Sequence, residues 1–266
     1  GILKWATSFN IGFNKNKVLS LGDNNTTLFG GWSNANTHVF MVGEPTRSYY
    51  MYDAVGVYRT QEDLLHYPIM SGQKVGDVRY RDVNGDGIIT DADRTLVGKA
   101  RPDYTFGMNN RFNYKKFDLS ISISGQLGGY LYSMLGRNLD RPTGNSGTGN
   151  LLAKWKNMWI SEEEPGDGKT PSFFSTTTTD LYDTRWLYKT DFIKIKNVTF
   201  GYTIPINRKI ARKARVYCSI QNLWTWDKYD GGFSPEASTY GSKKTGYDYG
   251  SYPMARVYTL GVNLNF

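Results

Sequence analysis

The twelve residues from Asp82 to Asp93 carry the pattern best suited to chemistry in this 266-residue chain. Calcium loops of this length take oxygen ligands at alternating positions, with a glycine at the sharp turn and a backbone carbonyl after it. The matching residues are Asp82, Asn84, Asp86, Ile88, Thr90 and Asp93, with Gly87 at the turn and Asp93 where glutamate is usual. The spacing predicts a structural calcium site that holds a loop in place.

The neighbours of this acidic segment qualify the calcium prediction. They do not have the pattern of the paired helices that flank an EF-hand loop, so the segment would act as a stand-alone clasp. An alternative is a turn rich in Asx residues and glycine, whose side chains cap their own backbone.

Three tryptophans in the polar stretches between strands are candidates for binding substrate. They are Trp155, Trp159 and Trp186. Indole rings can stack on sugars, but large aromatic side chains also pack loops against one another. Both interpretations remain open from the sequence, and the packing interpretation is the simpler one.

Other residue patterns argue against an enzyme and against a nucleic-acid-binding protein. His38 and His66 are the only histidines, and neither has a serine or cysteine partner at a recognisable spacing. A single cysteine, Cys218, excludes an intrachain disulfide framework. The net charge is +8, but lysine and arginine are scattered along the chain without a basic stripe or a known motif. We therefore expect neither catalysis nor nucleic-acid binding.

Strict alternation of apolar and polar residues predicts the elements that position these loops. Residues 257–266, 1–13 and the hairpin 104–127 alternate with period two, so each strand has one apolar and one polar face. Further strands are expected at 16–22, 36–44, 48–58, 190–204 and 213–226. Around Lys196 the apolar positions change from odd to even, which predicts a β-bulge. The fold class is therefore all-β, with about nine antiparallel strands.

The connections between these strands alternate in length. Short turns are expected near 14–15, 45–47, 115–116 and 205–212, and long connections at 23–35, 59–103, 128–189 and 227–255. In an up-and-down sheet this alternation gathers the long loops at one end, as in outer-membrane barrels with long extracellular loops. The polar residues of the strands, such as Asn109, Arg111, Ser120, Ser122 and Asn263, would then face the lumen.

An odd number of strands cannot close such a barrel, because bacterial single-chain barrels have even counts. An open edge would leave backbone groups unpaired in hydrocarbon. The chain opens in a strand pattern without a signal peptide, which predicts a processed or truncated protein. Residues 1–266 are thus interpreted as the C-terminal segment of a larger barrel. The alternative is a soluble, calcium-stabilised, carbohydrate-binding β-sandwich at the cell surface, and a third possibility is an outer-membrane barrel without TonB coupling.

Several segments resemble one family in the order in which that family has them. They are 3–18, 55–63, 76–87, 195–202, 221–223 (Gln-Asn-Leu) and 252–266 with its terminal phenylalanine. Together they resemble the SusC/RagA-like TonB-dependent outer-membrane transporters of Bacteroidetes over almost the whole chain.

The resemblance implies a 22-stranded barrel in the outer membrane that encloses an N-terminal plug. It implies active import of a large nutrient, a glycan or a peptide, with a SusD-like surface lipoprotein as a lid and membrane lipid around the barrel. Coupling to TonB would use an N-terminal region that residues 1–266 lack, together with the plug and the first strands. An aromatic last residue suits recognition by the machinery that inserts barrels.

Overall fold

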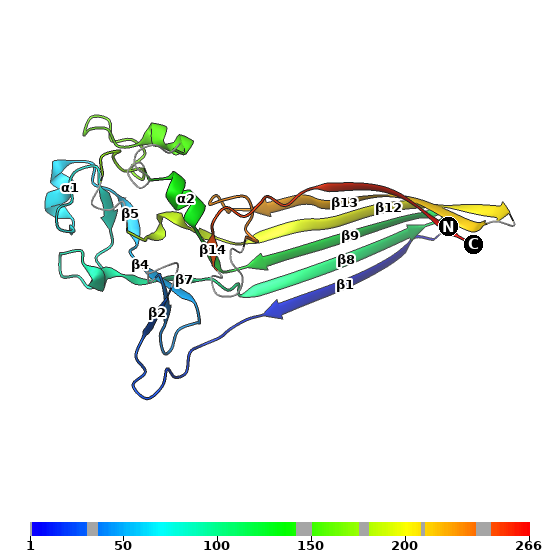
Figure 1. The fold of residues 1–266 in the computed structure, drawn as a ribbon, viewed down its shortest axis with the longest axis horizontal. Helices are drawn as coiled ribbons and strands as arrows, with labels where there is room; N and C mark the ends of the chain where they lie inside the picture. The colour runs from blue at the N-terminus through cyan, green and yellow to red at the C-terminus, as the bar shows by residue number, and fades with distance from the viewer. Residues whose placement is uncertain (1, 31–36, 142–150, 176–180, 209–210, 238–245) are drawn as a thin grey trace.

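The protein is elongated, with a long sheet at one end and a cluster of short elements at the other (Figure 1). The computed structural model describes residues 2–30, 37–141, 151–175, 181–208, 211–237 and 246–266. No helix in these ranges has the length and apolar character needed to cross a membrane.

Six strands form the long sheet, and every neighbouring pair is antiparallel. In spatial order they are β1 (Lys4–Phe13), β8 (Tyr104–Tyr114), β9 (Phe117–Leu127), β12 (Phe192–Arg208), β13 (Ala211–Asp227) and β15 (Val257–Asn265). Neighbours in the sheet are also successive long strands along the chain, so the sheet is an up-and-down meander. It is open in the described residues, with β1 and β15 at its edges.

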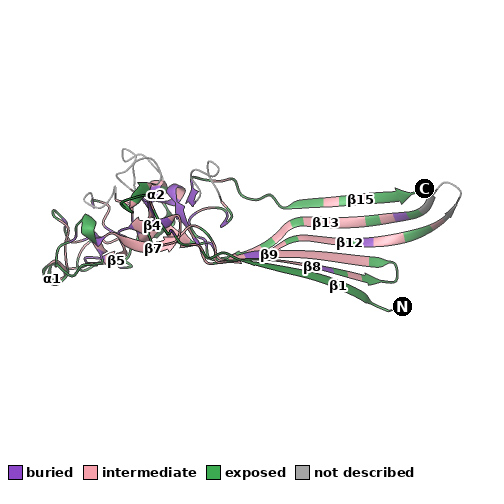
Figure 2. Cartoon of the chain, turned by 90° about the horizontal axis from the view of Figure 1, so that it is seen from below, coloured by how far each residue is buried: buried purple, intermediate pink, exposed green. Residues whose placement is uncertain are grey.

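The pairing register aligns the apolar residues of all six strands on one face. Phe9 lies opposite Met108, which in turn lies opposite Ile123, and the pattern continues across the sheet to Leu260 opposite Cys218. Many of these side chains are exposed, including Phe9 and Leu260, and most of the sheet is coloured exposed or intermediate in Figure 2. A continuous exposed apolar face of this size marks contact with a membrane or a partner.

The predicted β-bulge is confirmed at Lys196. Between Ile195 and Asn197, strand β12 has one residue more than its neighbour β9, whereas β13 has two residues opposite this one. This extra residue moves Val198 onto the same face as Ile195, which keeps the apolar face continuous. Strand β13 is irregular at the same level, where Asn222 has a left-handed backbone (φ 54°).

The sorting of loops by length is also confirmed. The β8–β9 turn, with Lys115 at φ 56°, and the adjoining ends of β12 and β13 lie at the end of the sheet that holds both termini (Figure 1). The connections that leave β1, β9 and β13 at the opposite end are long, and they build the cluster of short elements. In the described residues no second sheet covers the apolar face, as a soluble sandwich would require.

Six of the about nine predicted antiparallel strands form the long sheet. Residues 16–22 form no strand, and 36–58 contains only β3 (His38–Phe40), β4 (Ser48–Met51) and β5 (Ala54–Val57). These short strands belong to the loop end, where β3 and β4 are largely buried on both faces. Their sequences alternate poorly because burial on both faces removes the polar positions. The short turns expected at 14–15 and 45–47 lie within the long β1–β8 connection.

The loop end contains the remaining elements. The strands are β2 (Leu28–Gly30), β6 (Val78–Tyr80), β7 (Thr95–Lys99), β10 (Tyr130–Ser133), β11 (Leu187–Lys189) and β14 (Tyr247–Asp248). The helices are α1 (Gln61–His66) and α2 (Met134–Leu139), with 3₁₀ turns η1 (Asp91–Asp93), η2 (Ala153–Asn157) and η3 (Thr184–Trp186). Helix α1 begins where Thr60 and Asp63 make a capping box.

Tyrosine dominates the core of the loop end. Tyr49, Tyr132 and Tyr247 are buried together with Met51 and Trp186 in one cluster. A second cluster surrounds Tyr80 and Ile89. Two phenol groups reach other loops: the hydroxyl of Tyr80 donates a 2.8 Å hydrogen bond to Asp183 Oδ2, and that of Tyr49 donates to the carbonyl of Tyr130 at 3.1 Å. The long loops therefore form one packed unit that can hold a site in a fixed geometry.

Candidate functional site

Three parts of the molecule are candidates for function: the polar face of the long sheet, the acidic loop, and the cluster of loops around the tryptophans. The polar face carries cross-strand hydrogen bonds among uncharged side chains. Ser122 Oγ donates to Asn109 Oδ1 (2.6 Å), and the hydroxyls of Thr199 and Ser219 lie 2.9 Å apart. Asn197 Oδ1 accepts from Ser219 Oγ at 3.0 Å, beside the bulge.

The same face carries most of the charge of the sheet. Arg215 donates two hydrogen bonds to Asp118, across strand β12, at 2.9 Å and 2.5 Å. Lys196, which the bulge displaces, lines a recess of about 450 Å³ with polar residues that include Asn109, Ser122 and Asn197. This face suits water and polar solutes, whereas the opposite face suits lipid.

Two neighbouring polar residues, Thr7 and Asn110, lie on the apolar face, and the structure explains the position of Asn110. Asn110 lies opposite Thr7 and Ile121, in the row of apolar positions. The indole of Trp5 donates a 3.1 Å hydrogen bond to Asn110 Oδ1 and stacks on Phe112, so the amide is only 8% exposed. The shielding lowers the cost of placing an amide among apolar side chains.

The acidic loop folds around its own side chains. The carboxylate of Asp82 accepts from the backbone N–H groups of Gly85 (2.7 Å) and Gly87 (2.9 Å), and both glycines have positive φ. Asn84 Oδ1 accepts from Asp86 N (3.0 Å), and Asp86 Oδ1 accepts from Ile88 N (2.9 Å). The alternating Asx residues thus turn the backbone tightly, which both a calcium loop and a self-capping Asx-rich turn would require.

Asp93 closes this loop from within. It is fully buried, and its carboxylate accepts from Val83 N (2.9 Å) and Thr90 N (2.7 Å). Burial by itself raises the pKa of Asp93, but these backbone N–H groups outweigh it and hold the pKa below its ordinary value. The side chain of Asp82 lies within hydrogen-bonding reach of the same carboxylate. Within the described ranges, no group of three or more His, Cys, Asp or Glu side chains is gathered as in a formed metal site.

The predicted substrate-binding tryptophans are held within the loops. Trp155 and Trp186 are buried, and their indole N–H groups donate to the two oxygens of Asp140, at 2.8 Å and 3.0 Å. Trp159 is half-buried: it donates to the carbonyl of Arg59 (3.0 Å), and its ring covers the backbone at Gly76. These positions favour the packing interpretation, and a role in stacking on substrate stays a prediction.

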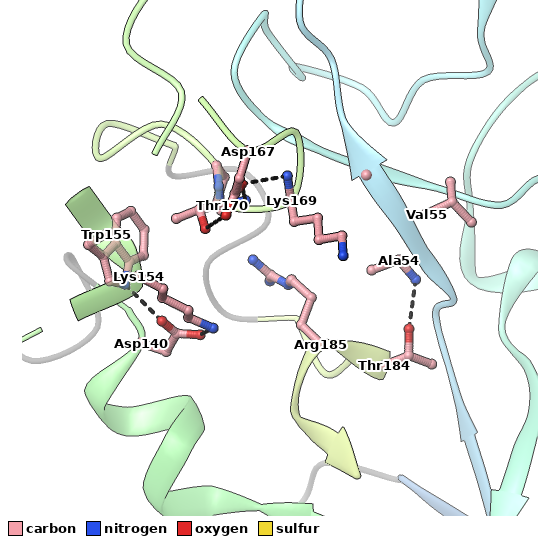
Figure 3. A pocket seen from close by; sticks show the side chains of 12 residues that line it. Ala54, Val55, Asp140, Lys154, Trp155, Asp167, Lys169, Thr170, Thr184 and Arg185 are labelled. Carbon is pink, nitrogen blue, oxygen red and sulfur yellow. Dashed lines mark hydrogen bonds and ion pairs between the residues drawn. The ribbon is translucent and has the colours of Figure 1, made fainter. Parts of the chain in front are cut away.

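A cavity of about 360 Å³ lies beside Trp155 (Figure 3). It is bounded by β5, Asp140, η2, residues 167–171 and η3. Figure 3 shows Lys154, Lys169 and Arg185 extending into it from three different segments. Arg185 is held in place by hydrogen bonds of 2.8 Å to 3.0 Å to Asp183, which is fully buried.

Two residues at the centre of the loop end, Asp140 and Asp183, were not found by reasoning from the sequence. Asp183 carried a local signal, because Asp183 and Arg185 are separated by one residue and could pair. Asp140 carried none: its partners Trp155 and Trp186 are 15 and 46 residues away along the chain.

A sheet with one polar face, one exposed apolar face and all long loops at one end defines the class of protein. It is a wall segment of an outer-membrane β-barrel. Comparison with known proteins specifies the class further. No protein-family model matches the chain.

Curated relatives of this chain are TonB-dependent receptors. TonB-dependent receptor P3 of Formosa agariphila is 31% identical over 276 residues, which cover 98% of this chain and 27% of the relative. Receptor P26 of the same organism is 29% identical, with the same coverage. TonB-dependent receptor SusC of Bacteroides thetaiotaomicron is 25% identical over 98% of this chain and 24% of its own length. The chain thus spans about a quarter of the length of the relatives it matches.

Solved structures show the same fold. The RagAB peptide importer in its 'open-open' state has a TM-score of 0.78 at 20% identity, over 99% of this chain and 27% of that one. The 'closed-closed' state gives a TM-score of 0.75 at 21% identity, with the same coverage. Over almost its whole length the chain is similar to SusC-like TonB-dependent receptors, and its fold matches the C-terminal part of RagA/SusC-type barrels. Such proteins are located in the outer membrane, and they are receptors and transporters and not enzymes.

Proposed function

We propose that the chain is the C-terminal segment of the barrel of a receptor that imports a large nutrient, a glycan or a peptide, in a TonB-dependent manner. The similarity to TonB-dependent receptors over 98% of the chain carries this proposal. In the whole protein, further strands and a plug would complete the barrel, a SusD-like lipoprotein would cover its outer end, and TonB would contact the N-terminal region. Residues 1–266 would then belong to one barrel domain.

The polar face supports a passive role for this segment in transport. No bond of the nutrient changes; the wall has to offer hydrogen bonds to water and solute while the other face contacts lipid. Ser122, Asn109 and the hydroxyls of Thr199 and Ser219 already satisfy one another laterally. A wall whose groups are paired with one another binds solute weakly, and weak binding lets a solute pass.

Nutrient-dependent growth tests the proposal. Deleting the gene of the full-length receptor should abolish growth on one glycan or peptide and leave growth on glucose unchanged, and loss of TonB should have the same effect. The lipoprotein partner should co-purify with the tagged receptor. Growth that survives loss of TonB would contradict the coupling, and a receptor that purifies without a lipoprotein would contradict the lid.

We also propose that the acidic loop binds calcium, with Asp82, Asn84, Asp86, Ile88, Thr90 and Asp93 as the ligands. The spacing of the oxygen-bearing residues supports it, since the structure folds this segment into one tight loop around the side chains of Asp82, Asn84 and Asp86. When bound, the ion would supply rigidity to the loop and no step of transport.

Proteolysis of the full-length receptor tests the calcium proposal. Calcium should protect residues 82–93 from cleavage in the parent protein, and Asp86→Ala should abolish this protection, because it removes an exposed ligand oxygen without disturbing the core. Asp230→Ala, in a different loop, is the matched control and should retain the protection. Equal cleavage with calcium and with a chelator in the parent protein would reject the site.

A further inference from the structure

The cavity beside Trp155 has an unequal supply of hydrogen-bonding groups. Its carboxylates are already occupied by the protein. Asp140 accepts from the indole N–H groups of Trp155 and Trp186 and pairs with Lys154. Asp167 accepts from the backbone N–H groups of Lys169 (2.8 Å) and Thr170 (2.7 Å) and from the hydroxyl of Thr170 (2.9 Å).

The donors that line the cavity are less fully used. An ammonium group has three N–H donors, and Lys154 pairs with Asp140 alone among the described residues. Lys169 is exposed, and within the described part of the chain its ammonium has no ion-pair partner. Arg185 also lines the cavity, and its charge is paired with that of the buried Asp183. The cavity is therefore rich in donors and poor in acceptors.

A ligand that matches this surface brings acceptors and negative charge. Carboxylate and sulfate groups do so, because each presents several oxygens and no strong donor. A neutral sugar, by contrast, brings hydroxyl donors for which the cavity has few acceptors left. The volume of about 360 Å³ is in the range of small-ligand pockets. Val55, Trp155 and Pro171 supply apolar surface next to the cations, as a sugar ring requires.

We propose that this cavity binds an acidic sugar unit, a hexuronate or a sulfated sugar, with Lys154 and Lys169 on its anionic group. The proposal rests on the proposed import function and narrows its substrate to an anionic glycan. Lys169 is the specificity-determining residue, because its ammonium lines the cavity and forms no ion pair with any residue in the described ranges.

Binding to the purified full-length receptor in detergent tests the proposal. Four probes of similar size are used: trigalacturonate, a sulfated trisaccharide, neutral maltotriose, and a triglutamate peptide. At least one of the two anionic sugars should bind, and Lys169→Gln should weaken that binding about tenfold, the effect of losing one charge-assisted hydrogen bond. Lys156 belongs to the same 3₁₀ turn, η2, as Lys154, but it does not line the cavity. Lys156→Gln removes the same charge and should leave affinity unchanged.

Each other outcome overturns the proposal. Equal affinities of Lys169→Gln and Lys156→Gln would show that the cavity does not bind the anion. Stronger binding of maltotriose or of triglutamate would assign the cavity to a neutral glycan or to an acidic peptide. The measurement needs neither TonB nor a membrane, so its failure leaves the import proposal standing. The growth assay with the gene deletion, which tests the import proposal, does not depend on this cavity.

Discussion

Asp140→Ala is the sharpest test of how the loop end is built. The carboxylate of Asp140 is almost fully buried, and each of its oxygens accepts one indole N–H, from Trp155 and from Trp186. Alanine provides no acceptor, so two donors inside the loop core lose their partners. The salt bridge to Lys154 is lost as well, but that lysine is 41% exposed and can be solvated by water.

The size of the effect follows from the two indoles. A buried donor left without a partner costs about 1–3 kcal/mol, so two such donors cost about 2–6 kcal/mol. Even the lower value raises the population of the opened loop about 30-fold, because 1.4 kcal/mol corresponds to a factor of ten. The cost should fall on the loop end alone, since the long sheet does not contact these residues.

Hydrogen exchange of the full-length receptor in detergent measures this change. Backbone amides of α2 and β11 should exchange about 30-fold faster in Asp140→Ala, and amides of β9 should be unchanged. Asp140→Asn keeps one acceptor oxygen and should show an intermediate effect, while Asp230→Ala, an exposed position, serves as the control. Unchanged exchange in Asp140→Ala, with unchanged tryptophan fluorescence, would refute the view that these indoles depend on Asp140.

Three further predictions concern other parts of the chain. Burial lowers the pKa of His38 from 6.5 to about 4, so an opened loop binds the proton more readily than the packed loop does. The packed loop therefore has its full stability above pH 6.5 and loses up to about 3 kcal/mol as the pH falls to 4. Hydrogen-exchange rates at pH 7 and pH 5, corrected for intrinsic exchange, should show this loss of stability in the parent and in the exposed-site control His66→Gln. Equal stability of the parent at the two pH values would contradict the burial of His38. Asn222→Val should destabilise the barrel by about 1–2 kcal/mol in thermal unfolding, because valine is strained at φ 54°. Asn222→Gly also loses the hydrogen bond to the carbonyl of Ala255, but glycine tolerates this φ and should cost less. Equal losses in the two variants would exclude backbone strain at residue 222. Trp5→Phe keeps an aromatic ring but leaves Asn110 Oδ1 without its donor, and should lower stability by about 1–3 kcal/mol. An unchanged stability would show that an unpaired amide on the apolar face has no cost.

The sequence determined the long strands and their two faces. Alternation with period two is a local property, and it identified β1, the β8–β9 hairpin, β12, β13 and β15 without knowledge of their partners. The bulge at Lys196 was readable for the same reason, because one extra residue inverts the alternation. The calcium-loop pattern is also local, although ion binding itself stays a prediction.

Tertiary structure decided the number of strands in the wall and the role of the loops. Short strands such as β3 and β4 are buried on both faces, so their sequences carry no alternation that separates them from wall strands. The position of Asp140 between two tryptophans, and that of Asp183 under Tyr80 at a separation of 103 residues, depend on which loops meet. Such contacts are set by the packing of distant segments, and no spacing along the chain records them. The cavity beside Trp155 exists for the same reason, because five separate segments enclose it.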